Sequence, residues 1–299
     1  MKKILILAIA LAVGVLSVDA QVFNASVPER LGTIKGTMAI ISADGKFVIT
    51  NTEAGLERVD VATGESKFVA ESPNSYNFVI SPDGKTLAFN RAYVGEDQLR
   101  RVSLEIIKIA DGAKEMIVKP SRNLSAGVSM AGNKLVALDN GKVKTKKLGK
   151  AKKVDTPLIT TSYGHLDITE NGKTRHLDPL GKGSYLWPSI SPDGKRILFR
   201  LVGEGVFTCN LDGSDVREVA KKIAMPVWAG NDAILGLITT DDSHYILSSN
   251  VTAVSLKDGA KQQLTPNDML PMGVSCSADG SVAVFNNGNG ELYTIRLKE

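Results

Sequence analysis

The chain has 299 residues, of which 43% are hydrophobic and only 5% aromatic, and its formal net charge is +4 at pH 7. A balance this close to neutral argues against a nucleic-acid-binding protein of this size. The three histidines and two cysteines show no His-x-His, His-x-x-x-His or Cys-x-x-Cys spacing typical of a metal site. We therefore expect no nucleic-acid partner, no metal and no cofactor.

The N-terminal segment 1–20 has the pattern of a secretory signal. Lys2 and Lys3 precede an apolar run from Ile4 to Val18, and Val18-Asp19-Ala20 forms a small-residue cleavage site before Gln21. Because position 21 is Gln rather than Cys, a lipid anchor is not indicated, and no later stretch is apolar enough to cross a bilayer. We expect residues 21–299 to form a single domain, periplasmic or secreted, with no transmembrane segment after signal removal.

A strand-turn-strand signature then occurs six times. The clearest copies, at 78–89 and 188–199, contain Ser-Pro-Asp-Gly; those at 41–49 and 276–285 have Ala in place of Pro, and variants at 130–137 and 228–235 contain Ala-Gly-Asn. Pro presets φ in such a turn, Asp accepts backbone hydrogen bonds, and Gly adopts the positive φ that closes it. We expect the aspartates to stabilise turns rather than to bind a ligand or metal: Asp44, Asp83, Asp193 and Asp279.

A second signature lies between these copies and supplies further strands. An alternating strand followed by a turn that ends in Gly recurs at 58–64, 106–112, 207–213 and 254–259. Two hairpins per repeat make a four-stranded antiparallel blade. The sequence thus predicts an all-β fold, a β-propeller.

The two ends of the chain predict how the ring closes. The last repeat supplies a third strand at 291–297 but no fourth, and the segment 27–31 resembles an outer strand, so we expect an N-terminal strand to complete the last blade. The blade number is open because an unusually long interval separates the turn glycines Gly132 and Gly194. That interval fits either seven blades, one of them reduced between Leu158 and Asp178, or six blades with an inserted hairpin.

Large side chains precede several copies of the first signature. Because the inner strands of a propeller line its channel, these residues are candidates for a ligand- or partner-binding funnel mouth, although packing between blades explains each one singly. They are Tyr76, Tyr185, Trp187, Met225, Met269 and Met272.

Three other features have structural and functional interpretations. Seven lysines between Lys142 and Lys153 form either a solvated outer strand or a patch for an acidic partner. The segment Asp241 to Tyr245 is either a polar loop or an acid–base site. Cys209 and Cys276 lie in different repeats, so we expect free thiols rather than a disulfide.

The run Trp187 to Phe199, with Ser-Pro-Asp-Gly at its centre, resembles the WD40-like "PD40" repeat of TolB-type propellers, and the resemblance covers essentially all of residues 21–299. It implies a fold rather than a ligand. TolB proteins carry an α/β domain before the propeller and work with a peptidoglycan-associated lipoprotein. Here only a short segment separates Gln21 from the first repeat, so we expect that domain, and with it the TolB function, to be missing.

Together these patterns favour an exported, monomeric, non-enzymatic propeller that binds a protein or glycan in the cell envelope or outside the cell. No Gly-x-Ser-x-Gly, P-loop or dinucleotide motif is present, and no catalytic residue can be named. The alternative is a propeller-type lyase or hydrolase that acts on glycans.

Overall fold

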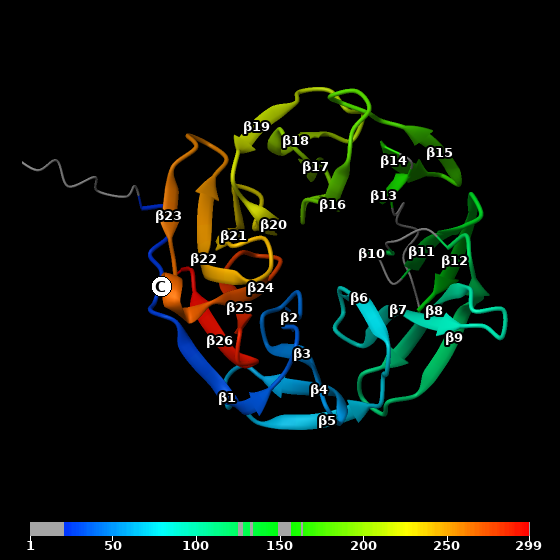
Figure 1. Cartoon of the computed structure of the whole chain (residues 1–299), viewed down its shortest axis with the longest axis horizontal. Coiled ribbons are helices and arrows are strands. Elements are labelled where there is room, and N and C mark those ends of the chain that lie inside the picture. Colours follow the sequence, from blue (N-terminus) through cyan, green and yellow to red (C-terminus); the bar gives the residue numbers. More distant parts are fainter. Residues whose placement is uncertain (1–20, 125–127, 132–133, 149–156, 163, 299) are drawn as a thin grey trace, which may run out of the picture.

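Seven β-sheets surround a central axis and form a β-propeller in the computed structural model of the chain (Figure 1). The structure describes residues 21–124, 128–131, 134–148, 157–162 and 164–298. This confirms the all-β prediction and the seven-blade alternative. None of the helices in the described ranges is long and apolar enough to cross a membrane.

Five blades have four antiparallel strands, and Figure 1 shows them around the ring. From channel to rim, the first two are β2 (Ile40–Ile41), β3 (Phe47–Thr52), β4 (Gly55–Asp60) and β5 (Ser66–Ala70), then β6 (Ser75–Ile80), β7 (Thr86–Val94), β8 (Arg100–Lys108) and β9 (Lys114–Ser121). The next two are β16 (Tyr185–Ile190), β17 (Arg196–Leu201), β18 (Gly205–Asn210) and β19 (Arg217–Ala220), then β20 (Ala224–Ala229), β21 (Ala233–Asp241), β22 (Ile246–Ser255) and β23 (Lys261–Gln263).

Two other blades have three strands within the described residues, where the sequence predicted one reduced blade. They are β10 (Ser129–Ala131), β11 (Lys134–Asp139) and β12 (Lys142–Lys147), then β13 (Leu158–Ser162), β14 (His165–Glu170) and β15 (Lys173–His176). The predicted turn at Gly132 lies outside the described residues.

An N-terminal strand completes the last blade, as predicted. That blade runs from channel to rim as β24 (Pro271–Cys276), β25 (Val282–Asn287), β26 (Glu291–Arg296) and β1 (Glu29–Lys35), and a short 3₁₀ helix, η1 (Asn267–Met269), precedes it. β1 is antiparallel to β26, with Arg30 opposite Tyr293. Since the two ends of the chain form one sheet, β26 is not left as an open edge.

The turn between the first and second strands of each complete copy is a hydrogen-bonded unit. In the copy that begins at Ser191, this hydroxyl donates to Asp193 Oδ1 (2.6 Å) and accepts from the backbone N–H of Arg196 (2.9 Å). The same Ser–Asp contact occurs in the turns that contain Asp44, Asp83 and Asp279. These contacts confirm that the four aspartates stabilise the turns.

Apolar side chains fill the space between neighbouring blades. One cluster combines Leu235 and Val251 of blade β20–β23 with Phe285 and Ile295 of the last blade, and all four are fully buried. The strands between channel and rim are therefore covered on both faces, which accounts for their continuous apolar runs.

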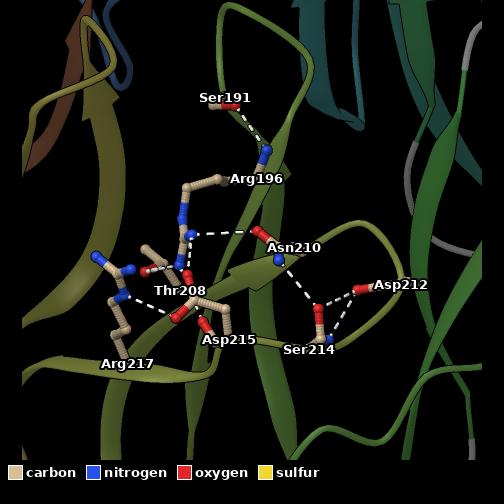
Figure 2. A network of polar contacts seen from close by, with 8 residues as sticks. All are labelled: Ser191, Arg196, Thr208, Asn210, Asp212, Ser214, Asp215 and Arg217. Atoms are coloured by element: carbon tan, nitrogen blue, oxygen red, sulfur yellow. Dashed lines mark hydrogen bonds and ion pairs between the residues drawn. The ribbon is translucent and has the colours of Figure 1, made fainter.

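The blade edge that carries the turns is held by polar contacts, and Figure 2 shows the network in blade β16–β19. The guanidinium of Arg196 donates to Asp215 Oδ2 (2.7 Å) and to Thr208 Oγ1 (3.1 Å), so it joins the second strand, the third strand and the turn that follows. Arg196, and secondarily Arg217, lowers the pKa of Asp215 by donating hydrogen bonds to it.

Alternation of strand direction gives the ring two different faces. The Ser-x-Asp-Gly turns and the turns between third and fourth strands lie on one face, which we call the turn face. The inner strands begin at the opposite face, where the hairpins between second and third strands also lie, and we call it the hairpin face. The hairpins β7–β8 and β21–β22 have the longest strands described, of nine or ten residues.

Candidate binding site at the channel mouth

A cavity of about 660 Å³ occupies the channel between the inner strands of five blades, β2, β6, β16, β20 and β24. Its wall includes Phe78, Trp187, Pro188, Met225, Pro226 and Met272, and none of the described residues that line it has a charged side chain. Volumes of this order are typical of small-ligand pockets. The cavity therefore offers apolar contacts and selects against charged groups, which would lose their hydration without gaining a partner.

Trp187 and Met225 stand at the opening of this cavity on strained backbone. Each interrupts the register of its inner strand with a β-bulge, between Leu186 and Ser189 in β16 and between Ala224 and Val227 in β20. Trp187 has φ 49° and Met225 has φ 48°, a left-handed conformation that large side chains seldom adopt. Strain of this kind is typical of residues whose orientation matters to function.

The bulges turn both side chains toward solvent, where Met272 of β24 joins them. Trp187 is 40% exposed, Met225 41% and Met272 40%, and all three line the cavity. We call these three residues the channel mouth. Methionine adapts its shape to a bound group, and tryptophan provides a rigid apolar surface.

Arg200 of β17 holds the indole ring of Trp187 in place. Its guanidinium carbon lies 5.9 Å from the centre of the ring, and its Nη1 donates to the carbonyl oxygen of Ile223 (2.9 Å). An arginine that is itself anchored fixes the ring by a cation–π contact. No pattern in the sequence points to this residue, because it lies on a different strand from Trp187.

The cavity wall also contains an unpaired polar atom. The hydroxyl of Ser189 is buried and has no hydrogen-bond partner among the described residues. A buried hydroxyl without a partner costs about 1–3 kcal/mol, so an occupant that hydrogen-bonded to it would recover part of that cost.

Met38 lines the same cavity, and the sequence analysis did not select it. It stands seven residues before the turn glycine Gly45, as Trp187 stands seven residues before Gly194. Counting back from the turn would have identified it, since repeats place equivalent residues at equal distances from their turns.

The other selected residues do not line this cavity. Tyr185 is only 3% exposed and packs against Phe199 in the core, and its hydroxyl donates to the carbonyl oxygen of Gly181 (2.6 Å). Tyr76 lies at the start of β6 with the guanidinium carbon of Arg100 5.4 Å from its ring centre. Met269 is in η1 and packs against the core of the last blade. Three of the six candidate residues thus line the cavity: Trp187, Met225 and Met272.

The segment from Asp241 to Tyr245 forms the tip of the β21–β22 hairpin. Asp242 Oδ1 accepts hydrogen bonds from the backbone N–H groups of Tyr245 (2.7 Å) and His244 (2.9 Å). These bonds, that from Tyr245 first, lower the pKa of Asp242, so it stays ionised. The aspartate stabilises the tip, which accounts for its presence without catalysis.

The other two histidines and two aspartates form a square across β14, the end of β15 and the segment that follows it. His165 is hydrogen-bonded to Asp178, His176 Nδ1 lies 2.6 Å from Asp167 Oδ1, and the two imidazole rings stack with centres 4.2 Å apart. Across the described residues, no three His, Cys, Asp or Glu side chains are grouped so that they could hold a metal.

The lysine-rich strand and the cysteines contribute no site within the described ranges. Lys142, Lys144 and Lys147 are exposed on β12, and Lys146 pairs with Glu115 of the next blade; the lysines from 150 to 153 lie outside the described residues. Both cysteines are free thiols, as predicted.

A second cavity, of about 720 Å³, lies where β1 meets the blade β2–β5 on the seam of the ring. Arg30, Lys46, Asp60 and Arg296 line it, so its charges are mixed. Two chain segments approach closely at this seam, since a Cβ on Gly32 would lie 2.4 Å from the carbonyl oxygen of Gly64. The exposed Trp187, Met225 and Met272 line the channel cavity instead, so we place the candidate site at the channel mouth.

Solved structures with the same architecture share little sequence with this chain. No family model matches the sequence, and no curated protein does. The structure is similar to that of a putative TolB from Agrobacterium tumefaciens, with a TM-score of 0.50 and 16% identity over 93% of this chain and 99% of the other. The chain has a TolB-like β-propeller fold.

Other solved β-propellers match this chain with TM-scores of 0.50 or more. The β-propeller domain of Cps50 (Swd1) from Myceliophteria thermophila matches with a TM-score of 0.56 and 12% identity over 91% of this chain and 100% of the other. An oligogalacturonate lyase from Vibrio parahaemolyticus matches with a TM-score of 0.50 and 14% identity over 90% of this chain and 80% of the other. At such identities the likeness establishes the fold and leaves the function to the site.

Proposed function

We propose that this protein is an exported, non-enzymatic binding module that takes an apolar, uncharged part of its ligand or partner into the channel mouth. The observation that carries the proposal is the pair of strained bulges that turn Trp187 and Met225 toward the cavity. A protein core does not need two large side chains in left-handed conformation and about 40% exposed, whereas a recognition surface does.

A glycan-active lyase or hydrolase is the second candidate, because an oligogalacturonate lyase shares the fold. Galacturonates are acidic, and their recognition calls for cationic groups. The described residues that line the channel cavity provide no arginine, lysine, histidine or carboxylate for charge recognition or for acid–base catalysis. The composition of the wall thus favours the binding module.

The test uses two probes of opposite chemistry, the neutral apolar dye Nile red and oligogalacturonate. We expect Nile red to bind with a fluorescence increase, and Trp187→Ala or Met225→Ala to weaken that binding by about 2 kcal/mol, or roughly 30-fold. Lys147→Ala and Leu180→Ala are the controls, one on the lysine-rich strand and one on the hairpin face outside the cavity, and we expect a change of well under about 1 kcal/mol for each.

Three results would overturn the proposal. The first is dye binding that survives the two mouth substitutions. The second is binding that requires the lysines at physiological salt. The third is binding or cleavage of oligogalacturonate at the channel, which would support the enzyme.

A further inference from the structure

The exposed apolar side chains of this protein lie mainly on one face. Of the 13 large hydrophobic residues that are exposed in the described part of the chain, ten belong to the hairpins of the hairpin face, to the starts of inner strands or to the segment that leads into β16. They are Val94, Leu99, Leu180, Trp187, Val202, Met225, Tyr245, Ile246, Leu247 and Met272. The other three described ones, Val27, Phe68 and Met116, lie on or before rim strands rather than on the turn face. A concentration of exposed apolar side chains on one face is typical of an interaction surface.

Three of the ten are consecutive at the tip of the β21–β22 hairpin. Tyr245 is 75% exposed, Ile246 38% and Leu247 61%. Leu247 is the extra residue of a bulge, since Thr240 pairs with Ser248 and Asp241 pairs with Ile246. All three are exposed, so the hairpin tip presents a continuous apolar surface to solvent.

This hairpin adjoins the channel mouth. The hydroxyl of Ser249 in β22 donates to the carbonyl oxygen of Pro271 (2.7 Å), the residue before Met272. Figure 1 shows the hairpin beside β24. Tyr245 lies four positions before Ser249, which corresponds to at most about 14 Å of extended chain. We group two residues of the mouth with the three of the tip and call this set the apolar track: Met225, Met272, Tyr245, Ile246 and Leu247.

The far end of the apolar track is acidic. Asp241 and Asp242 lie at the hairpin tip, and hydrogen bonds from the backbone, first from Tyr245, lower the pKa of Asp242. Two negative charges there are repelled by an anionic membrane surface, which attracts basic segments instead. They attract a partner that carries lysine or arginine.

We infer that the apolar track binds an extended polypeptide segment whose uncharged apolar residue enters the channel mouth and whose basic residue reaches the hairpin tip. This inference rests on the proposed function and adds the chemistry of the partner. A small molecule fills the cavity but does not cover the apolar hairpin beyond it, whereas a segment of about four or five extended residues does.

The full chain is expressed in a host that exports it, and the exported protein is purified. It is then used to select ligands from a random dodecapeptide library displayed on phage. We expect the enriched peptides to combine an apolar core with lysine or arginine and to lack aspartate and glutamate. A synthetic copy of the enriched peptide is then titrated against variants. The paired change Tyr245→Ser with Leu247→Ser is expected to weaken binding at least tenfold, and Asp241→Asn with Asp242→Asn to weaken it and to reduce its salt dependence.

The control is Val202→Ser, an exposed apolar residue on the β17–β18 hairpin, which should leave the affinity unchanged. Because these residues are exposed, unchanged melting curves are expected for all the variants. If Trp187→Ala loses binding while the Tyr245 and Leu247 variant binds fully, the proposed function at the channel mouth stands and the inference about the apolar track is wrong. The inference is also wrong if no peptide is enriched, or if the enriched peptides are acidic.

Two further outcomes would assign the hairpin to another occupant. One is binding to phosphatidylcholine–phosphatidylglycerol vesicles that the Tyr245 and Leu247 changes abolish. The other is self-association, measured by light scattering, that the same changes abolish. Either result overturns the inference in favour of a membrane or of a second copy of this chain.

Discussion

Trp187 and Met225 occupy equivalent positions in two neighbouring blades. Each stands at the bulge of an inner strand, each has φ near +50°, and each is followed by proline. The same unusual conformation at the same place in two repeats shows that the repeat provides the bulge and that each copy presents a different side chain from it.

The strain at this position predicts an unusual order of stability for two substitutions of Met225. A left-handed conformation costs a residue with a Cβ about 1–2 kcal/mol, and glycine does not bear this cost. We expect the free energy of unfolding of Met225→Gly to exceed that of Met225→Ala by about 1 kcal/mol, measured by urea denaturation. Both variants should lose Nile red binding alike.

The control for this comparison is Phe68, an exposed residue of the rim strand β5. There the backbone is extended, so glycine should be the less stable substitution by about 0.5–1 kcal/mol. If Met225 showed the same order as Phe68, the bulge would not be strained and the argument for its function would weaken.

Two turn glycines should respond differently to alanine. Both have a positive φ, +75° at Gly194 and +71° at Gly280. A Cβ on Gly194 would meet nothing within 4 Å, whereas one on Gly280 would lie 2.7 Å from the backbone nitrogen of Gly230 in the next blade. We expect Gly194→Ala to cost about 1–2 kcal/mol and Gly280→Ala clearly more, measured by thermal and urea unfolding. Equal losses would show that the blades separate easily at this contact.

The N-terminal segment should be required for a stable ring. Gln262 Oε1 accepts hydrogen bonds from the backbone N–H groups of Val22 and Phe23 (2.8 Å each), and its Nε2 donates to the carbonyl oxygen of Phe23 (3.1 Å). Deleting residues 23–31 should lower the melting temperature or cause aggregation, because it removes the contacts of Phe23 and the β1 residues that pair with Tyr293 and Thr294, which exposes the edge of β26. The milder change Gln262→Ala should cost about 1–3 kcal/mol.

Arg30→Ala tests whether the loss is specific to these part-buried contacts. Arg30 forms an ion pair of 3.2 Å with Glu291 in the same sheet, and its side chain is 47% exposed. An exposed pair contributes about 0–1 kcal/mol, so this variant should melt close to the parent protein. A deletion variant that melts like the parent would contradict the closure of the ring by β1.

The buried thiol of Cys209 should make the protein sensitive to alkali. Burial raises the pKa of this thiol from 9.0 to about 11. The folded state therefore holds the proton more tightly than the unfolded state between these two values. Stability from the neutral thiol is complete below pH 9 and is lost as the pH rises through 11.

The measurement is the slope of the unfolding free energy against pH. Cys209→Ala should show a shallower decline than the parent between pH 9 and 11, whatever its stability at neutral pH, because the group that releases a proton on unfolding is gone. Identical slopes in the two proteins would mean that the thiol is not buried.

The fold was largely predictable from the sequence because the signals of the repeat are local. Pro, Asp and Gly specify the turn through their own backbone preferences, and the apolar run after each turn specifies a strand covered on both faces. The closure by β1 was also predictable, since a last blade with three strands needs a fourth. The blade number was not, because the long interval between Gly132 and Gly194 admitted two interpretations that only the packing of β13–β15 resolves.

The site depended on the tertiary structure. Sequence alone placed Tyr185 and Trp187 together, but the alternation of the strand buries Tyr185, and the bulge turns Trp187 outward. A bulge depends on how one strand pairs with its neighbour, so its position could not be predicted from the sequence of a single strand. The contact of Ser249 with Pro271, which brings the β21–β22 hairpin to the channel mouth, joins residues of two blades and exists only once these blades have packed against each other.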